Sequence, residues 1–304
     1  MAVRSHFGDG DPHVQIPENL RRRDVVIFSS GGLGVNSQAA METFFIIDAA
    51  QRAGASDITA VFPYAPFFRG DKKSRPREPI QARVFLKLLQ TSGANRFMTV
   101  DAHSAQCAGF FDGGTDFLEA RKLLSRAITH YAMNDSALIE SGSNFDPREA
   151  TIMGPDKGSA GLTDSYSRIL GARYRAQGIK TRDFDSENVS NVGEIMGTTE
   201  GRYTVLVDDI GDSLGTLTTA AELAMRHGSR GVLAVVTHGI FSRDALQRLD
   251  DSPISLCITT DTVDLREEVR NHPKIRVVSV APLLADAVYR NHVGASLSRS
   301  SAQF

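Results

Sequence analysis

The stretch that decides the fold is residues 203–221, YTVLVDDIGDSLGTLTTAA. It begins with a short apolar run, residues 204–207, which is rich in β-branched side chains and is typical of a buried parallel strand. Asp208 and Asp209 follow, and a turn of small residues then leads into a predicted helix over residues 217–227. A strand that reaches a helix N-terminus through such a turn can bind phosphate, because free N–H groups and the helix dipole both face the anion.

The two acids allow a second use for the same stretch. Carboxylates at the carboxyl end of a strand can hold Mg²⁺ or accept hydrogen bonds from sugar hydroxyls, whereas they repel phosphate. Asp, Ser, Gly and Thr are also ordinary turn and cap residues. On local pattern alone, a well-capped crossover without any ligand therefore remains an alternative.

Length and composition indicate a soluble protein of about two domains. A chain of 304 residues can bury a sizeable core. Its formal charge of −2 gives no electrostatic footprint for nucleic acid, and no run of 18 apolar residues offers a membrane span. Cys107 and Cys257 lie far apart in sequence, so we expect no disulfide framework and a cytoplasmic location.

Strand-like and helix-like segments alternate along the chain. Strands are predicted at residues 25–28, 57–62, 96–100, 150–153, 204–207, 231–236, 254–259 and 275–280, and helices at 38–52, 79–92, 164–175, 217–227 and 283–290. This alternation favours right-handed βαβ crossovers and therefore an α/β fold with two doubly wound parallel sheets. We expect a first domain over residues 1–133, which the tail 291–304 could join, and a second over 134–290.

A basic segment follows the predicted strand 57–62. Residues 63–77, PYAPFFRGDKKSRPR, hold five cations in nine positions, and their prolines and Gly70 disfavour helix. Random basic clusters are mostly solvated loops. This one leaves the carboxyl end of a strand, where α/β sheets bind ligands, so a polyphosphate site is the stronger hypothesis.

An Asp-x-His pair ends the next predicted strand, in residues 99–116, TVDAHSAQCAGFFDGGTD. A lone histidine is more often structural than a ligand. Asp101 and His103 alternate at one strand end, however, where a carboxylate and an imidazole could share a Mg²⁺ or its water shell.

Two further segments are ambiguous by themselves. Residues 154–161, GPDKGSAG, are a glycine-rich strand-to-helix loop that could be a plain crossover. Residues 179–197 are polar and weakly periodic, which predicts a mobile, solvated loop.

Together these segments resemble the ribose-phosphate pyrophosphokinase family, which shares one loop with the type I phosphoribosyltransferases. That loop has the pattern V-D-D and then D-[TS]-x-G-T, which this chain matches at residues 207–209 and 212–216. The family pattern D-x-H-x-x-Q-x-x-G-F-F-D binds metal and is matched from Asp101 to Asp112. The pattern P-Y-x-x-Y-x-R-Q-D-[KR], which holds the ATP triphosphate in the family, is matched at Pro63, Tyr64, Arg69, Asp71 and Lys72, with Gly70 in place of Gln.

The ambiguous segments also have counterparts in the family. The glycine-rich loop resembles S-P-D-x-G-G at Pro155, Asp156 and Gly158. The polar loop resembles a flexible catalytic loop that begins K-x-R, with matches at Lys180 and Arg182, although acids follow here where the family has basic residues.

Near the N-terminus, Phe7, Asp9 and Asp11 resemble F-x-[DN]-x-E, with Asp11 in place of Glu. In the family this motif contacts the adenine of ATP bound by a neighbouring subunit. About 30 residues that precede it in the family, a first strand and helix among them, have no counterpart here, a length that is large relative to a typical crossover unit. This difference would either alter the oligomer contacts or mark a divergent branch. The resemblance extends from Phe7 to Tyr289.

The resemblance implies a Mg²⁺-dependent homo-oligomeric enzyme of the type I phosphoribosyltransferase fold, which converts ATP and ribose 5-phosphate into phosphoribosyl pyrophosphate and AMP. It implies catalytic roles for Lys180, Arg182 and His103. It implies ATP binding by Phe7, Asp9, Asp11, Arg69, Asp71 and Lys72, and metal binding by Asp101, His103, Asp112 and Asp156. It implies ribose-phosphate binding by Asp208, Asp209, Asp212, Ser213, Leu214, Gly215 and Thr216.

Two alternatives remain open. The acidic residues after Arg182 and the altered position 70 would also suit a variant pyrophosphokinase with a larger ribose 5-phosphoryl acceptor, such as ADP-ribose. A non-catalytic associated subunit would keep the fold and regulate an active partner, but it would be expected to lose chemistry-bearing residues that this chain retains.

Overall fold

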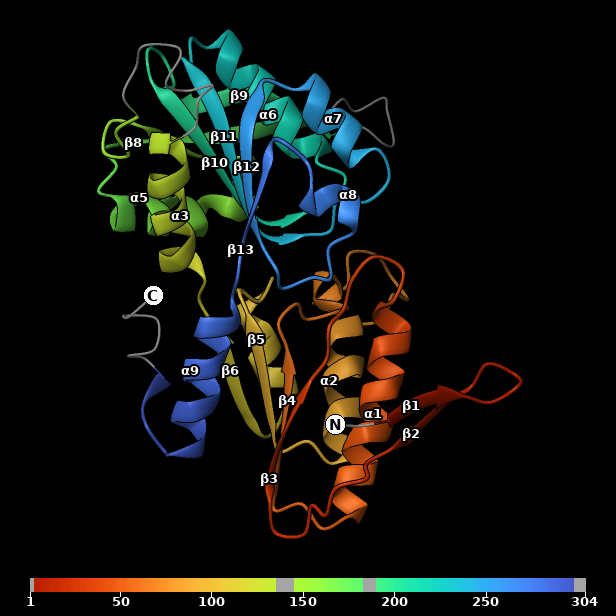
Figure 1. The fold of residues 1–304 in the computed structure, drawn as a ribbon. Coiled ribbons are helices and arrows are strands. Elements are labelled where there is room, and N and C mark those ends of the chain that lie inside the picture. Colours follow the sequence, from red (N-terminus) through yellow and green to blue (C-terminus); the bar gives the residue numbers. More distant parts are fainter. Residues whose placement is uncertain (1–2, 135–144, 183–189, 298–304) are drawn as a thin grey trace. The chain divides into compact units, whose positions relative to one another are not determined.

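The chain divides into two compact units, each with its own main β-sheet (Figure 1). A computed structural model describes residues 3–134, 145–182 and 190–297, without the side chains of residues 134, 180–182 and 190–192. Unit 1 comprises residues 1–119 and 262–264 together with the segment that begins at Ala281, and unit 2 comprises residues 120–261 and 265–280.

The division differs from the predicted boundary at residue 133. Unit 1 ends at Glu119, and helix α3 (Arg121–Asn134) belongs to unit 2 because it packs on strands of that unit's sheet. Helix α9 (Ala281–His292) belongs to unit 1, although its residues up to 290 were expected in the second domain. A helical pattern shows that a helix forms but carries no information on which sheet it will cover.

Unit 1 contains, in chain order, β1 (Val3–His6), β2 (Pro12–Gln15), β3 (Asp24–Phe28), α1 (Asn36–Arg52), β4 (Asp57–Phe62), the 3₁₀ turn η1 (Phe68–Gly70), α2 (Gln81–Ser92), β5 (Arg96–Val100), the 3₁₀ turn η2 (Ala105–Phe110) and β6 (Gly114–Leu118). Strands β3-β4-β5-β6 form a parallel sheet in that order, and β1 and β2 pair as an antiparallel hairpin. Figure 1 shows α1 and α2 on one side of this sheet and α9 on the other.

The core of unit 1 forms from the apolar strands that the sequence predicts. Ile58 and Phe62 of β4 are buried with Phe97 of β5, beneath Ile47 of α1 and Leu86 of α2. Strand β6 was not predicted, because its five residues are mostly half-buried and include a charged one. The sheet of unit 1 therefore has one more parallel strand than the sequence indicates.

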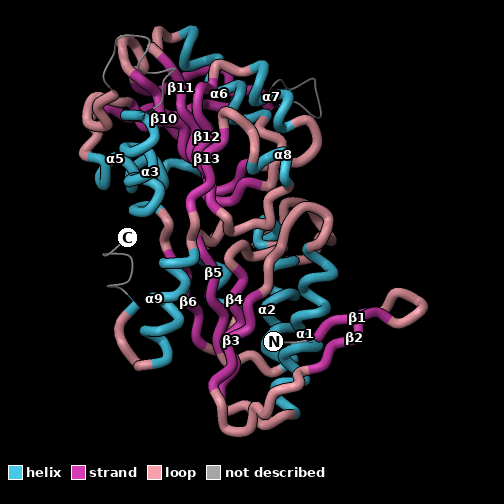
Figure 2. The backbone as a smooth tube through the Cα atoms, in the orientation of Figure 1, coloured by secondary structure: helices cyan, strands magenta, loops and turns pink. Residues whose placement is uncertain are grey.

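Unit 2 contains, besides α3, the elements β7 (Thr151–Gly154), the 3₁₀ turn η3 (Lys157–Ser159), α5 (Ala160–Leu170), β8 (Tyr174–Arg182), β9 (Ser190–Gly197), β10 (Tyr203–Gly211), α6 (Gly215–Arg226), β11 (Gly231–Gly239), α7 (Ala245–Asp251), β12 (Ile254–Thr260), α8 (Glu267–Arg270) and β13 (Ile275–Val278). The seven strands follow the order β13-β12-β11-β10-β7-β8-β9, and all pairs are parallel except β8 with β9 (Figure 2).

Alternate residues of the central strands face opposite layers of helices. Leu206 of β10 and Val236 of β11 pack against Ala220 and Ala224 of α6 in one buried cluster. Helices α3 and α5 cover strands of the same sheet, α3 on β11 to β13 and α5 on β7, β8 and β10. Strands buried on both faces explain the near-continuous apolar runs in the sequence and confirm the α/β fold of doubly wound parallel sheets.

Two predictions for the middle of the chain were wrong. The helix expected over residues 164–175 ends at Leu170, with Gly171 in the left-handed conformation as its C-cap, and a strand begins at Tyr174. Of the segment 179–197, expected to be a loop, residues 179–182 and 190–197 belong instead to β8 and β9, which pair antiparallel from Ala176↔Gly197 to Arg182↔Ser190. Hairpin pairing at a sheet edge needs no apolar periodicity, so the polar sequence gave no sign of it.

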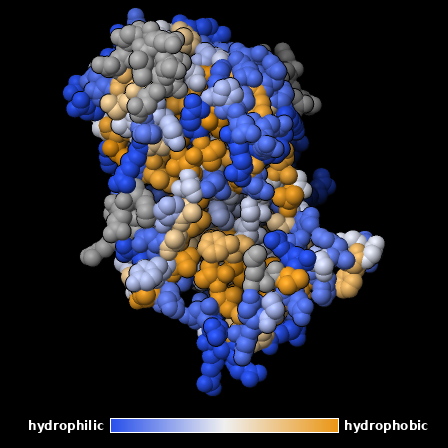
Figure 3. Space-filling view, in the orientation of Figure 1, coloured by the Kyte–Doolittle hydropathy of each residue, from blue (hydrophilic) through white to orange (hydrophobic). Residues whose placement is uncertain are grey.

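The surface is mainly hydrophilic, but apolar residues gather over the strands of unit 1 on the face shown in Figure 3. Phe28, at the end of β3, is 56% exposed. Among the described helices, none combines the length and the apolar character needed to cross a membrane.

Candidate functional site

The carboxyl end of β10 carries the two acids that the sequence singled out. The strand continues beyond the predicted residue 207 to Gly211, and Asp208 pairs in register with Val236 of β11. The preceding residues, Tyr203–Val207, are all buried, whereas Asp208 and Asp209 are only partly so. The apolar half of the strand thus anchors the acids at the edge of the sheet where parallel α/β sheets bind ligands.

Negative charge accumulates at this edge. The pKa of Asp208 is raised to about 8, first because the carboxyl is buried and then because the charges of Asp209 and Asp156 lie close by. The Asp209 N–H donates to Asp208 Oδ1 at 3.1 Å and offsets part of the shift. No described cation pairs with Asp208. A cation or hydrogen-bond donors from a ligand would relieve this repulsion.

The turn after β10 presents free backbone N–H groups. Leu214 adopts the left-handed conformation, φ 60°, and is followed by Gly215 and Thr216 in the first turn of α6. No side chain caps this end, and the first turn contains no acid. An anion is therefore the group that the N-terminus of α6 is built to accept.

The loop after β11 holds this turn in place. Ser242 donates from its backbone N–H to Asp212 O at 3.0 Å and from its hydroxyl to Asp212 Oδ1 at 2.5 Å. Ile240 and Phe241 donate their N–H groups to Gly211 O at 2.8 and 3.0 Å. Asp212 thus shapes the loop, whereas the sequence suggested only that it binds ligand.

Arg248 adds a cation that the sequence did not point to. It lies on α7, and its Nη1 would be 3.1 Å from a Cβ atom placed on Gly215. Its Nε donates to Asp244 Oδ2 at 2.8 Å, which holds the guanidinium over the start of α6. Arg248 is separated from the loop by a strand and most of two helices, so no motif could have revealed it.

The second glycine-rich loop meets the same sheet edge. Asp156 precedes η3, and its carboxylate accepts from Gly158 N at 2.9 Å in a capping box with Ser159. A Cβ atom on Gly154 would lie 2.7 Å from Ser159 Oγ and from Gln177 Nε2, so only glycine fits there. Because Asp156 also raises the pKa of Asp208, the structure brings these two predicted residues together.

In unit 1 the basic segment leaves the carboxyl end of β4 through η1. Arg69 and Lys72 are exposed, whereas Asp71 is partly buried. Burial raises the pKa of the Cys107 thiol to about 11, and the nearby charge of Asp71 adds to this shift. The segment therefore offers its cations to solvent or to a ligand.

The predicted metal ligands of unit 1 do not form a cluster. Asp101 directly follows β5 and has a positive φ of 37°, and His103 is exposed. Asp112 accepts instead from Lys87 Nζ at 2.5 Å and Gln90 Nε2 at 3.1 Å, and these hydrogen bonds lower its pKa. Within the described residues, no three His, Cys, Asp or Glu side chains are grouped so that they could hold a metal ion.

Comparison with known proteins agrees with this architecture. Residues 1–93 match the N-terminal domain of ribose phosphate pyrophosphokinase, and residues 187–300 match the phosphoribosyl synthetase-associated domain. A ribose-phosphate pyrophosphokinase from Caldanaerobacter subterraneus is 36% identical over 96% of this chain and 87% of its own length. One from Aquifex aeolicus is 35% identical over 98% of this chain and 89% of its own length.

The chain belongs to the ribose-phosphate pyrophosphokinase family. The solved structure of phosphoribosylpyrophosphate synthetase from Mycobacterium smegmatis is similar throughout, with a TM-score of 0.86 and 31% identity over 97% of this chain and 91% of that one. The fold and the family that the sequence suggested are thereby confirmed.

The adenine motif of the pyrophosphokinase family lies at the tip of the β1-β2 hairpin. Phe7, Asp9 and Asp11 are exposed, and Phe7 is 58% so. Asp9 Oδ1 accepts from Asp11 N at 3.1 Å, and the Phe7 ring meets His13 edge-on at 5.2 Å between centroids. The tip is thus ordered by its own contacts and leaves these side chains open.

The pyrophosphokinase family's K-x-R motif lies on β8. The backbones of Lys180 and Arg182 pair with Val192 and Ser190 of β9, but their side chains lie outside the described part of the chain. Residues 183–189, which include the acids of the predicted catalytic loop, lie outside it as well.

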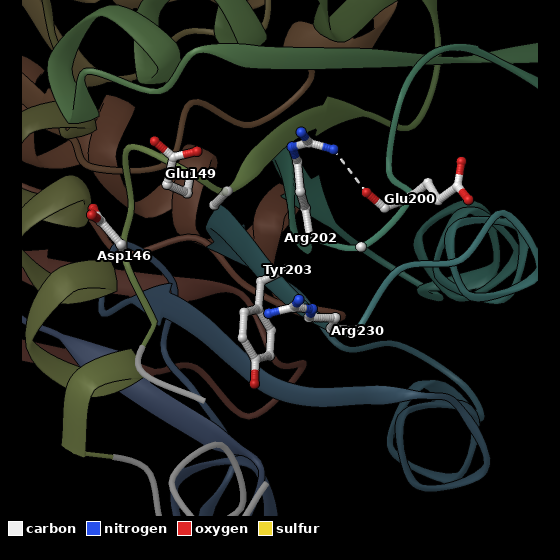
Figure 4. Close-up of a pocket in the computed structure, with 8 residues that line it drawn as sticks. Asp146, Glu149, Glu200, Arg202, Tyr203 and Arg230 are labelled. Atoms are coloured by element: carbon white, nitrogen blue, oxygen red, sulfur yellow. Dashed lines mark hydrogen bonds between the residues drawn. The ribbon is translucent and has the colours of Figure 1, made fainter. Parts of the chain in front are cut away.

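A polar cavity of about 480 Å³ lies at the opposite, amino edge of the sheet in unit 2 (Figure 4). Its residues follow no motif of the pyrophosphokinase family, and sequence analysis did not predict them. It is lined by Asp146, Glu149, Ala150, Glu200, Gly201, Arg202, Tyr203 and Arg230.

Proposed function

We propose that this chain transfers the β,γ-pyrophosphoryl group of MgATP to the C1 hydroxyl of ribose 5-phosphate, giving phosphoribosyl pyrophosphate and AMP. The observation that carries the proposal is the carboxyl edge of the sheet in unit 2. There the carboxyl groups of Asp208, Asp209 and Asp156 lie close together, next to the uncapped N-terminus of α6. Such an edge accepts an anion and a hydroxyl-rich or metal-bound group side by side.

Ribose 5-phosphate fits this edge by charge. Its phosphate would bind the N–H groups of residues 212–216 and the guanidinium of Arg248, which lies over Gly215. Its hydroxyls would donate to Asp208 and Asp209. Asp208 and Asp209 are followed closely in sequence by the phosphate-binding residues 212–216. A single strand-turn-helix element therefore sets the spacing between the ribose contacts and the phosphate contacts.

ATP binding is proposed for residues of unit 1. Arg69 and Lys72 would hold the polyphosphate, with Asp71 between them in sequence, because these cations are exposed at the carboxyl end of β4. The adenine base would contact the hairpin tip of a second subunit at Phe7, Asp9 and Asp11, so we expect a homo-oligomer. A cytoplasmic location is proposed as well.

The donor set also fits a magnesium ion. The acids of unit 2 offer oxygen ligands, and their mutual repulsion would fall on binding a cation. Mg²⁺ usually takes one or two carboxylates and completes its shell with water and substrate phosphates, so a site without three protein ligands suits it. Asp156 would contribute a ligand in unit 2. In unit 1, Asp101 and His103 would offer ligands of their own, whereas Asp112 would first have to leave Lys87. Bound with ATP, the ion would neutralise phosphate charge.

The reaction needs positioning more than covalent chemistry. The C1 oxygen forms a bond to the β-phosphorus as the bond from that phosphorus to the α-phosphate oxygen breaks, and AMP leaves while the hydroxyl proton goes to solvent. Lys180 and Arg182 would stabilise charge on the transferring group, and a catalytic role is also proposed for His103. The acids of unit 2 would fix the direction of the C1 hydroxyl.

The proposal is tested by incubating the purified chain with ATP, MgCl₂ and ribose 5-phosphate. Equal amounts of AMP, measured by chromatography, and of phosphoribosyl pyrophosphate, measured by phosphorus NMR, are expected. A parallel reaction with ADP-ribose identifies a larger acceptor. The proposal fails if ribose 5-phosphate gives no AMP. Turnover of ADP-ribose alone would then identify the variant enzyme, and inertness towards both acceptors would favour the regulatory subunit.

A further inference from the structure

One carboxamide near the basic segment of unit 1 has no hydrogen-bonding partner. Gln81 is the first residue of α2, and it is exposed. Its side chain makes no hydrogen bond to any residue that the structure describes. In the same unit Gln38 donates to Glu42 at 2.9 Å and Gln90 to Asp112 at 3.1 Å, whereas the side chain of Gln51, like that of Gln81, makes no hydrogen bond to a described residue.

The side chain of Gln81 lies against the backbone of Gly70. A Cβ atom placed on Gly70 would come within 2.5 Å of Gln81 Oε1 and 3.0 Å of Gln81 Cβ. Contacts below 3.0 Å force something to move, so the present position of the carboxamide depends on the absence of a side chain at residue 70. Gly70 does not need glycine for its own backbone, because its φ lies outside the left-handed region.

The surroundings of this carboxamide are those of an anion site. Gly70 ends η1 directly between Arg69 and Asp71, and Lys72 follows. The N-cap of α2 is Ile80, which has no side chain to cap the helix, and the first turn carries no acid. The side chain of Gln81 therefore leaves the first turn of a helix that no side chain caps, and it lies against a residue that directly follows the exposed Arg69. A helix N-terminus and a cation both favour a phosphate.

The same place carries an amide in the sequence pattern of the family, but from a different position. That pattern has Gln where this chain has Gly70, and here the side chain of Gln81 fills the space beside that residue. In this chain a carboxamide lies beside residue 70, supplied by Gln81 of the neighbouring helix.

We propose that Gln81 is an ATP-binding residue whose carboxamide donates a hydrogen bond to the polyphosphate, and that Gly70 is glycine in order to make room for it. The inference rests on the proposed function, since it assigns the nucleotide to the basic segment. A hydrogen bond to a phosphate oxygen whose charge is the same in the ground and transition states stabilises both equally, so it governs KM for ATP rather than kcat.

The test is a set of variants at the two positions. Gln81→Ala should raise KM for ATP about tenfold or more, which corresponds to the loss of one hydrogen bond to a charged group. The same variant should change kcat and KM for ribose 5-phosphate less than about threefold. Gly70→Ala should weaken ATP binding similarly by displacing the carboxamide. The double variant Gly70→Gln with Gln81→Ala returns an amide from the other position and should recover much of the lost affinity.

Gln51 provides the matched control. It too is exposed, and its carboxamide packs against a glycine, with Cδ 2.8 Å from a Cβ placed on Gly93. That pair lies at the far end of α2, away from the basic segment. Gln51→Ala should leave KM for ATP unchanged. The inference is wrong if Gln81→Ala also leaves KM unchanged, if Gln51→Ala raises it as much, or if the double variant is weaker than either single one.

Equilibrium binding of a non-hydrolysable ATP analogue separates this inference from the proposed function. If the wild-type chain binds the analogue and loses affinity in Gln81→Ala but makes no AMP from ribose 5-phosphate, the proposed reaction fails and the role of Gln81 stands. If the wild-type chain makes AMP and Gln81→Ala binds the analogue equally well, only the role of Gln81 is overturned. Thermal unfolding of each variant confirms that it is folded.

Discussion

The two edges of the sheet in unit 2 are both polar, but their charges are arranged in opposite ways. At the amino edge, Asp146 pairs with Arg148 at 3.0 Å and Glu149 with Arg173 at 2.9 Å. At the carboxyl edge, acids lie next to acids, and the pKa of Asp208 is raised to about 8. Acids that pair with arginines maintain the structure, whereas a buried carboxyl whose pKa is raised beside other acids indicates a place for a ligand.

The strongest test of this contrast exchanges one acid at each edge for its amide. Asp208→Asn keeps the shape of the side chain but replaces an ionisable carboxyl group with a neutral amide. We expect kcat/KM for ribose 5-phosphate to fall by about 100-fold or more. Glu149→Gln at the amino edge should change it less than about twofold. AMP formation at varied ribose 5-phosphate measures both, and equal losses would remove the distinction between the edges.

The same acid should make stability depend on pH. The unfolded chain releases the Asp208 proton near the usual carboxyl pKa, whereas the folded chain keeps it up to about pH 8. Between these values the folded state binds more protons, so the contribution of Asp208 to the free energy of unfolding falls as pH rises, by about 2 kcal/mol from pH 6 to pH 8.

Urea unfolding of the wild-type chain and of Asp208→Asn at both pH values measures this effect. The variant should be the more stable protein at pH 8 and should have a flatter pH profile, although it is the less active enzyme. An identical pH profile in the two proteins would show that burial and the neighbouring acids do not perturb Asp208. Such an outcome would leave the carboxyl edge no different from the amino edge.

Arg248 tests the anion half of the carboxyl edge. Its guanidinium lies over Gly215, and we expect Arg248→Ala to raise KM for ribose 5-phosphate about three- to tenfold with little change in KM for ATP. Arg226→Ala, at the other end of α6, is the control, because a cation there is a full helix away from the phosphate loop. Steady-state kinetics with each substrate varied gives both constants, and a rise in KM for ATP instead would move Arg248 out of the proposed ribose-phosphate site.

How far the sequence could predict these features depended on whether the signal was local. The acids of β10, its turn and the helix that follows lie within one continuous stretch, so strand pattern and turn chemistry were enough to propose a phosphate site there. The limits of β10 were less accurate, because residues 208–211 include two acids and a glycine and yet continue the pairing with β11. Backbone hydrogen bonding to a neighbouring strand can continue a strand beyond its apolar residues.

Features made by packing between distant segments could not be predicted. Arg248 meets Gly215, and Gln81 meets Gly70, only because separate elements fold together. Asp112 illustrates the converse, since its motif suggested a metal ligand, whereas the fold brings Lys87 and Gln90 of α2 to its carboxylate. A motif fixes residue types and spacing, but the partners of a side chain depend on tertiary structure.

The smallest expected effect belongs to the amino edge and concerns stability alone. The guanidinium of Arg202 lies 3.6 Å from the centre of the Tyr174 ring, and its Nη1 donates to Glu200 O at 2.8 Å. Arg202→Met keeps the apolar stem and removes the cation, so the free energy of unfolding should fall by about 1 kcal/mol. Arg230→Met, at an exposed residue that lines the same cavity, should lower the free energy of unfolding by less than about 0.5 kcal/mol.

Urea denaturation gives both values, and neither variant should alter KM for ATP or ribose 5-phosphate. A raised KM in Arg202→Met would mean that the paired charges of the amino edge also serve a ligand, and the contrast between the two edges would then be one of degree.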